Sequence, residues 1–301
     1  MAHSHEHHHE HHEHIEKTLN IAIALTAAIF VAEVIGGFIS GSLSLLGDAG
    51  HMFSDVFALF MALSAIKIAK KAPTKTKTYG YHRVKILAAF LNGVLLIGIS
   101  IWIFIEAYHR LSNPEPIKSG IMLVVALIGL AANLYAAFKL HGHNDLNVKG
   151  AFLHVVSDTL SSAAVIAAAI WIYFTGQTAV DAVLGFGIAV FILASAIGVL
   201  KESIHVLLQF TPKHIKFDRI IKDIERVKGV KGTHHVHIWS LASHINIIDA
   251  HIYTSEMNMR RIEQIKKEIK KNLEKYDIKH ATLEFECKEC ADNYKIKEVQ
   301  Y

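Results

Sequence analysis

Long runs of apolar residues fill the first two thirds of this chain and constrain its fold more than any other feature. A bilayer core about 30 Å thick is crossed by roughly 20 apolar residues in an α-helix. The chain is 52% hydrophobic, its mean hydropathy is +0.31, and six of its segments reach the required length. The segments are residues 18–40, 42–69, 84–108, 119–140, 148–174 and 180–208. The sequence therefore predicts an α-helical membrane protein with six transmembrane helices.

The basic residues between these segments predict how the chain is oriented. The first-to-second and fifth-to-sixth connections carry no lysine or arginine, whereas the second-to-third connection is strongly basic. Its basic residues are Lys67, Lys70, Lys71, Lys75, Lys77, Arg83 and Lys85. Because lysine and arginine are enriched in cytoplasmic loops, we expect this connection and both termini in the cytoplasm. A histidine- and glutamate-rich N-terminus does not resemble a cleavable signal peptide, so we expect a multi-pass protein of the cell (inner) membrane.

After Thr211-Pro212 the pattern becomes that of a small charged domain. A helical stripe is followed by two strand-like segments, a second helical stripe and a third strand. This α-β-β-α-β order predicts a cytoplasmic α+β ferredoxin-like domain, with two helices on a three-stranded sheet. The stripes are Ile220, Ile224 and Val227, then Ile262, Ile265, Ile269 and Leu273, and the strands are HHVHIWSL, HINIIDAHIYT and ATLEFE.

The chain is thus expected to have three parts: a cytoplasmic tail (1–17), a six-helix membrane domain (18–210) and a cytoplasmic domain (211–301). The net charge of +4 arises wholly in the last part. Its basic residues are interspersed with acidic ones, whereas nucleic-acid binding requires a clustered basic face. We therefore expect no nucleic-acid partner.

Two of the predicted membrane helices each carry a histidine and an aspartate four residues apart. They are His51 and Asp55 in DAGHMFSD, and His154 and Asp158 in FLHVVSD. Residues at this spacing share one face of a helix, and ionisable groups at bilayer depth are by default part of an ion pathway. Two imidazole nitrogens and two carboxylate oxygens suit a tetrahedral zinc ion, although cadmium, cobalt or nickel could compete for such ligands. The alternative is that these residues only pack between helices.

Further metal-binding residues lie outside the predicted helices. The first fourteen residues contain eight histidines, a composition that chelates metal but cannot build a core; the alternative is a purification tag. Asp48 lies one turn before His51 and could orient His51 or relay a proton. The alternative is that it is only a carboxylate near the start of its helix. Cys287 and Cys290 have zinc-like spacing, yet one such pair supplies half of a structural site.

Four segments carry a resemblance to a known family. SGSLSLLGDAGHMFSD, TYGYHRVKILAAFLNG, NVKGAFLHVVSD and VHIWSL resemble the cation diffusion facilitators, in the zinc-transporting branch with a histidine-aspartate pair on the second and fifth membrane helices. The resemblance covers nearly the whole chain. It implies a homodimer that exchanges cytosolic zinc for protons, with His51, Asp55, His154 and Asp158 at the transport site. It also implies a regulatory metal site at His234, His251 and Glu286, which Cys287 and Cys290 directly follow.

We therefore expect a proton-coupled antiporter that exports zinc, with cadmium or cobalt as alternative substrates. Zinc would be both the transported substrate and a regulatory ligand of the cytoplasmic domain, and the partners would be a second copy, the bilayer and protons. A passive metal channel or a membrane metal sensor is the main alternative. A membrane-embedded zinc hydrolase is disfavoured because a catalytic zinc keeps one coordination position open. We expect the protein not to be an enzyme.

Overall fold

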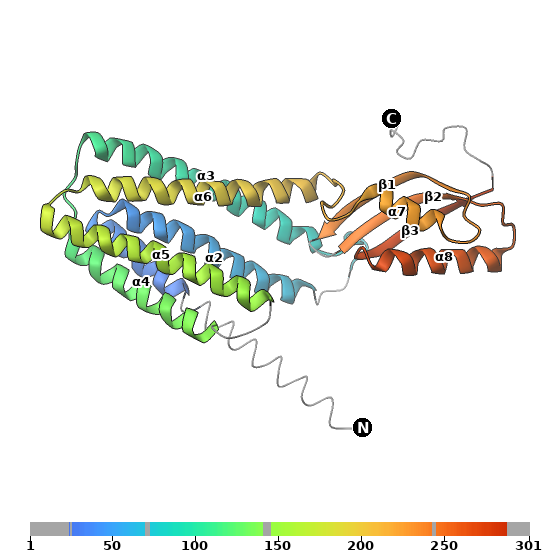
Figure 1. Cartoon of the computed structure of the whole chain (residues 1–301), viewed down its shortest axis with the longest axis horizontal. Coiled ribbons are helices and arrows are strands. Elements are labelled where there is room, and N and C mark those ends of the chain that lie inside the picture. The colour runs from blue at the N-terminus through green and yellow to red at the C-terminus, as the bar shows by residue number, and fades with distance from the viewer. Residues whose placement is uncertain (1–23, 25, 70–72, 141–145, 243–244, 288–301) are drawn as a thin grey trace, which may run out of the picture. The chain divides into compact units, whose positions relative to one another are not determined.

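The computed structural model describes residue 24 and residues 26–69, 73–140, 146–242 and 245–287. The chain separates into two compact units. One comprises Met1–Lys67 and Leu91–Leu200, and the other comprises Ile68–Phe90 and Lys201–Tyr301. The first unit is a helical bundle, and the second contains a β-sheet with two helices of its own (Figure 1).

The helices of the bundle follow the predicted apolar segments, although residues 18–23 of the first segment lie outside the described residues. They are Thr26–Ser40, α2 Leu43–Ala69, α3 His82–Ser112, α4 Ser119–Leu140, α5 Leu146–Thr175 and α6 Ala179–Leu207. Within the described residues, three stretches are by themselves long and apolar enough to cross a membrane: His82–Ser112, Val156–Thr175 and Ala179–Leu207. Thr26–Ser40 and Ser119–Tyr135 are shorter apolar helices. Helix α3 exceeds the predicted 84–108 at both ends, because polar residues such as His82 and Arg110 extend it beyond its apolar part.

The polarity of the bundle is the reverse of that of a water-soluble protein. Large apolar side chains on its outer surface are exposed, including Phe138 and Phe174 at 80% and 79%. Ionisable side chains are buried inside it, among them Glu33, Asp48 and Asp181. Hydrocarbon tails solvate apolar side chains but not ionisable ones, so this arrangement suits helices that face lipid.

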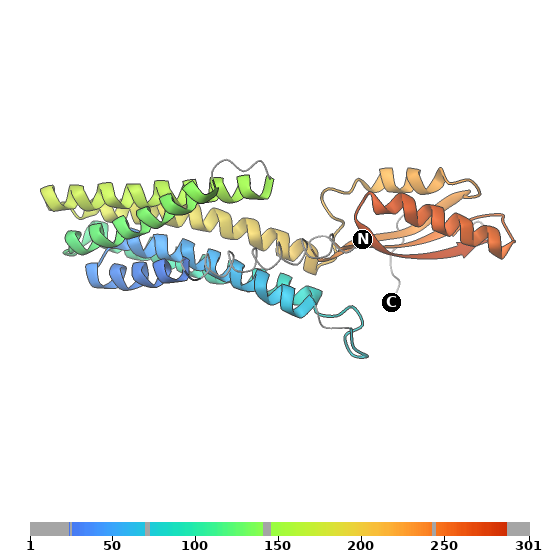
Figure 2. The same cartoon turned by 90° about the horizontal axis from the view of Figure 1, so that it is seen from below.

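The first turns of α2 contact the neighbouring helices on two sides. Leu45 packs in one buried cluster with residues of α4 and α5, whereas Leu43 packs in another with residues of α3 and α6. Gly185 of α6 lets α2 approach closely, because a Cβ atom there would lie 3.1 Å from Leu43 Cγ. Small residues at such crossings are typical of membrane bundles. Figure 2 shows the helices of the bundle from a second direction.

The second unit has the predicted α-β-β-α-β order. Its elements are α7 Phe217–Glu225, β1 Gly232–Ala242, β2 Ile245–Tyr253, α8 Met259–Glu274 and β3 Ile278–Glu286. The sheet order is β1-β2-β3, with β1 antiparallel and β3 parallel to β2. One detail of the prediction is wrong: Val227 was expected in the first helix but lies beyond its end, where it is still buried in the core.

Helices α7 and α8 cover one face of this sheet (Figure 1). Alternate strand residues, among them Ile248, Ala250 and Ile252, point into the core that the helices close. Because side chains alternate between the two faces of a strand, His251 points to the other face. That face carries the candidate metal ligands of this unit.

Candidate metal sites

Three of the four predicted ligands inside the bundle come together. Ligand atoms of His51 and Asp55 on α2 and of Asp158 on α5 all lie within 4.8 Å of one another. His51 Nε2 is 3.7 Å from an oxygen of Asp158, and all three side chains are partly buried. We call these residues the helix cluster. Their spacing is that of groups able to share one small cation, because metal ligands about 2 Å from an ion are held a few ångströms apart.

The fourth predicted ligand, His154, belongs to α5 and lies one turn before Asp158. Its side chain is outside the part of the structure that is described. The helical backbone nevertheless puts positions 154 and 158 on one face of α5. The expectation that His154 completes the site therefore stays a prediction.

Hydrogen bonds connect the surroundings of the helix cluster to neighbouring helices. The Ser161 hydroxyl on α5 donates to Asp48 on α2 over 2.6 Å. Asn92 on α3 donates to the Ser54 hydroxyl, also on α2, over 3.0 Å. Asp48 is buried, with 5% of its surface exposed. These bonds hold the turns of α2 that flank His51.

A second carboxylate, Asp181 at the start of α6, holds the beginning of α2. It is fully buried and accepts hydrogen bonds from the backbone N–H of Leu43 and Ser44, at 2.6 and 3.2 Å. The hydroxyls of Ser42 and Ser44 donate to it as well, at 2.7 and 2.5 Å. A carboxylate suits this position because the first N–H groups of a helix have no partner within it.

Asp181, Ser161 and the buried Glu33 were not predicted from the sequence. A signal for the two acids was present, since each is an isolated acidic residue in an apolar segment. Such residues are expected to be functional or paired. Ser161 gives no comparable signal, because serine is common in membrane helices.

The second candidate site lies on the sheet face that α7 and α8 leave uncovered. His234 on β1 pairs directly with His251 on β2, and a bulge follows between His234 and His237. His235, inside this bulge, has a positive φ of 52°. Directly paired residues of antiparallel strands share a face, so the extra residue moves His234 onto the face of His251.

Glu286 at the end of β3 completes this group, which we call the sheet cluster. One of its oxygens is 2.7 Å from His251 Nδ1, and the other is 3.1 Å from His234 Nε2. His234 is only 5% exposed, whereas His251 and Glu286 are partly buried. Two imidazole nitrogens and a carboxylate match the donors that zinc accepts, with room for a fourth ligand. The residues present therefore fit a zinc ion.

Of the two cysteines predicted to bind metal, the structure describes Cys287. Cys287 follows the sheet cluster and is exposed, and it belongs to neither metal-capable group found among the described residues. Cys290 and the N-terminal histidine tract lie outside the described residues. A role for the two cysteines in metal binding remains a prediction from their spacing.

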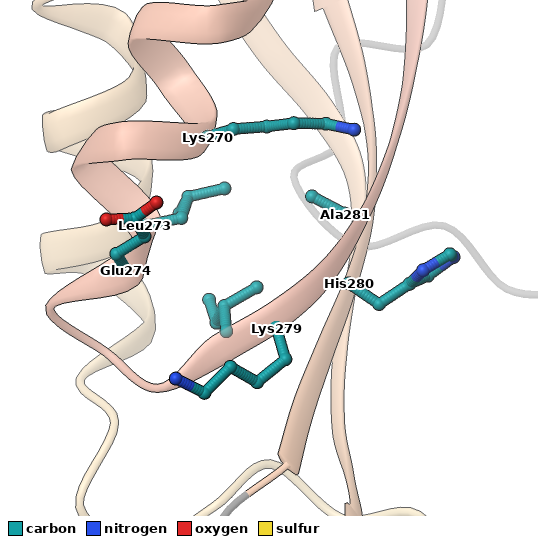
Figure 3. Close-up of a pocket in the computed structure, with 7 residues that line it drawn as sticks. Lys270, Leu273, Glu274, Lys279, His280 and Ala281 are labelled. Atoms are coloured by element: carbon teal, nitrogen blue, oxygen red, sulfur yellow. The ribbon is translucent and has the colours of Figure 1, made fainter. Parts of the chain in front are cut away.

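A cavity of about 320 Å³ opens between the end of α8 and β3, lined by Lys270, Leu273, Glu274, Ile278, Lys279, His280 and Ala281. Figure 3 shows Lys270 reaching from α8 toward the strand, while His280 points away from α8. Two lysines and a single carboxylate give this cavity a positive charge. It is therefore a poor site for a metal cation, and among the described residues the two clusters are the candidates.

Comparison with known proteins identifies relatives over nearly the full length. Residues 19–208 match the family described as "Cation efflux transmembrane domain", and residues 212–287 match "Cation efflux protein, cytoplasmic domain". Zinc transporter ZitB of Pectobacterium atrosepticum is 40% identical, over 98% of this chain and 92% of that protein. The cadmium, cobalt and zinc/H(+)-K(+) antiporter of Bacillus subtilis is 39% identical, over 95% and 92%. Metal cation efflux system protein CzcD of Cupriavidus metallidurans is 42% identical, over 96% and 90%.

Proposed function

The chain belongs to the cation efflux family, and on that premise we propose that it exports zinc from the cytoplasm in exchange for protons. It is a multi-pass membrane protein with a cytoplasmic C-terminal domain, and it is a transporter rather than an enzyme. The expected fold class, helical membrane domain plus α+β domain, is confirmed. The observation that carries the zinc proposal is the helix cluster, in which three metal-capable side chains meet inside the bundle.

The chemistry of the helix cluster suits a metal that must be released after it is bound. Its described donors are one imidazole nitrogen and two carboxylates, and His154 would add a second nitrogen. Zinc accepts four such ligands in a tetrahedral arrangement, whereas magnesium requires six oxygens. Thiolates would hold zinc more tightly, so ligands without sulfur favour release by a transporter.

Protons compete with the metal for the same histidine and aspartate side chains. Metal binds the deprotonated forms of histidine and aspartate, so its arrival releases protons and its departure lets them return. Histidine is suited to this exchange because its ordinary pKa lies near neutral pH. We propose that the cluster opens alternately to the two sides of the membrane, taking zinc from the cytoplasm and protons from outside.

The identity of the ion rests on the donors and on the relatives. One of the relatives is named a zinc transporter, and another is named for cadmium, cobalt and zinc. Affinity alone separates these ions poorly, because geometry and availability decide selectivity. We propose zinc as the main substrate, with cadmium and cobalt as further ones.

The sheet cluster is proposed to bind zinc as a regulatory ligand. His234, His251 and Glu286 would hold the ion and join β1, β2 and β3 at their adjacent ends. Zinc there would supply a positive charge that neutralises Glu286 and fixes the end of the sheet. We further propose that the protein acts as a homodimer joined through the cytoplasmic domain, in the cell membrane with both termini inside.

Zinc flux into proteoliposomes tests the proposed exchange. The full-length protein is reconstituted with a pH-sensitive dye inside the vesicles, and zinc is added outside with and without an imposed pH gradient. Acidic vesicle interiors should increase zinc uptake, and uptake should make the interior more alkaline. Protein-free vesicles and vesicles containing Asp158→Asn serve as controls.

The alternatives predict different outcomes. Zinc uptake that does not depend on the pH gradient and moves no protons would indicate a passive channel and contradict the proposal. High-affinity zinc binding without any flux would indicate a sensor, and would contradict it as well.

A further inference from the structure

Glu33 is a buried carboxylate inside the bundle that neither cluster includes. It lies in the helix Thr26–Ser40, and its side chain is 1% exposed. Its Oε2 atom has no hydrogen-bond partner among the described residues. An ionised carboxylate in such surroundings is costly unless it is paired, and it avoids the cost by taking up a proton.

The neighbouring helices leave space for this carboxylate without neutralising it. Gly129 on α4 has no side chain, and a Cβ atom there would lie 2.8 Å from Glu33 Oε1 and 3.8 Å from the Ser162 hydroxyl on α5. Ser162 is itself buried and accepts a hydrogen bond from Asn133 on α4, over 3.4 Å. The two polar side chains described at this point, Ser162 and Asn133, are uncharged.

Among the described residues, two acids act on Glu33 electrostatically. They are Asp48 on α2 and Asp158 of the helix cluster on α5. Ser162, beside Glu33, lies one turn after Asp158 on α5, so Glu33 is close to the helix cluster, where neighbouring negative charges make a further one unfavourable. A divalent cation bound beside Asp158 reverses the sign of the local charge and favours the carboxylate.

We propose that Glu33 carries one of the protons exchanged for the metal, without coordinating the metal itself. When zinc binds to the helix cluster, the O–H bond of the Glu33 acid breaks and the proton leaves to water, so that part of the incoming charge is balanced. When zinc leaves on the outer side, the carboxylate takes up a proton from that side. This inference rests on the proton-coupled exchange proposed above.

Counting protons on zinc binding tests the role of Glu33. Zinc chloride is titrated into the full-length protein in lipid nanodiscs, and the heat is measured by isothermal titration calorimetry. Repeating the titration in buffers of different ionisation enthalpy gives the number of protons released per zinc. Glu33→Gln keeps the shape of the neutral acid but has no proton to release. We expect it to bind zinc, to release about one proton fewer, and to show a pH dependence of log affinity that is shallower by about one per pH unit.

Two further variants serve as comparisons. Glu202→Gln makes the same substitution at an exposed position near the end of α6, and its proton count should equal that of the wild type. Glu33→Asp retains a titratable acid and should restore the released proton. Infrared difference spectra of the wild type should lose a carboxylic-acid C=O band on zinc addition, and this band should be missing in Glu33→Gln and shifted in Glu33→Asp.

The outcomes distinguish the role of Glu33 from the zinc–proton exchange proposed above. An unchanged proton count and an unchanged infrared band in Glu33→Gln would overturn the role of Glu33. Loss of zinc binding in a folded Glu33→Gln would also overturn it, because Glu33 would then be a ligand or a structural residue. If Glu33→Gln does not fold, the band of the wild type and its shift in Glu33→Asp decide the question. A wild type that releases no protons would instead refute proton exchange as a whole.

Discussion

At the scale of single residues, the polar side chains inside the bundle serve two different purposes. His51, Asp55 and Asp158 have ligand atoms close enough to share one ion. Asp48 accepts a short hydrogen bond from Ser161 and therefore fixes one helix against another. The two purposes predict different consequences of substitution. Removing a ligand should abolish metal binding, whereas removing a hydrogen bond should weaken the helix contact.

Asp158→Asn tests the ligand assignment with little change of shape. An amide oxygen is a weaker zinc ligand than a carboxylate and carries no charge, so zinc affinity should fall by at least about 100-fold. Zinc titration and vesicle uptake measure the loss, and size-exclusion chromatography confirms that the protein stays folded. Asp218→Asn, at an exposed position of α7, is the matched control. Uptake near that of the wild type in Asp158→Asn would show that Asp158 is not a zinc ligand.

The helix cluster shows what the sequence can predict at this scale. His51 and Asp55 follow from a local rule, because residues four apart on a helix share a face. Their meeting with Asp158 was inferred from the same pattern on a second helix. The bond from Ser161 to Asp48 joins residues 113 positions apart, and no local spacing indicates it. Such partners depend on how the helices pack, which one sequence does not specify.

At the scale of elements, the start of α2 is held by a residue from another helix. Asp181 accepts hydrogen bonds from two backbone N–H groups and two serine hydroxyls at this point. All of these donors are buried, so without Asp181 they would have neither this partner nor water. Asp181 therefore acts as an N-cap that α6 supplies to α2.

Asp181→Ala should destabilise the bundle strongly. A buried donor without its acceptor costs about 1–3 kcal/mol, and four donors lose a partner together. Ser42→Ala removes one of these donors and also the hydroxyl oxygen that accepts from the Leu45 N–H over 3.2 Å, so it should lower stability by about 1–2 kcal/mol, less than Asp181→Ala. Thermal unfolding of the full-length protein in detergent compares the two variants. Equal midpoints for Asp181→Ala and Ser42→Ala would contradict the capping role.

In the second unit, an acidic residue connects α7 to the segment between α8 and β3. Asp223 on α7 is 7% exposed. Lys275 Nζ lies 2.6 Å from one of its oxygens, to which the Tyr276 hydroxyl also donates over 2.5 Å. These hydrogen bonds, with that from Lys275 the largest influence, hold the pKa of Asp223 below its ordinary value. The ionised form is thus stabilised in the folded domain.

The stability that Asp223 contributes should depend on pH. It is fully present above the pKa of an unfolded-chain aspartate, about 3.9, and is lost as pH falls through the lower pKa of the folded state. Asp223→Asn should therefore lower the urea midpoint at pH 7, and the difference from the wild type should shrink below about pH 4. Trp239 fluorescence reports the transition once Trp102 and Trp171 are replaced by Phe.

Asp218→Asn makes the same substitution on the same helix at an exposed position, and its free energy of unfolding at pH 7 should stay within about 0.5 kcal/mol of the wild type. A difference between Asp223→Asn and the wild type that persists at low pH would show that charge is not the cause.

The elements of this unit also show where prediction from pattern ends. Stripes with helical spacing and alternating apolar residues were enough to predict the α-β-β-α-β order. The bulge after His234 was not predicted, because it requires a positive φ at His235, a histidine, where glycine would be the usual signal. Strict alternation from the buried Ile238 would place His234 in the core beneath the helices. The bulge brings it to His251 and Glu286 instead.

At the scale of the whole molecule, the charge is divided between the parts of the chain. Residues 1–210 carry equal numbers of basic and acidic side chains, and the net charge of +4 lies in residues 211–301. Candidate metal ligands occur in both parts, and the N-terminal histidine tract is a further candidate. We expect this tract to raise the local zinc concentration without forming part of the pathway, because a histidine-rich tract of this kind binds metal weakly and exchanges it quickly.

Deleting residues 1–14 tests this role of the tract. Tethering gives its eight histidines a high effective concentration near the membrane domain, which helps only when free zinc is scarce. The deletion should therefore raise the zinc concentration needed for half-maximal uptake and leave the maximal rate nearly unchanged. A variant with these histidines replaced by glutamine keeps the length of the tail and should behave like the deletion. Complete loss of uptake at saturating zinc would mean that the tract supplies structural ligands, with Cys287 and Cys290 as their candidate partners. If neither parameter changed, the tract would contribute nothing to transport, as expected of a tag.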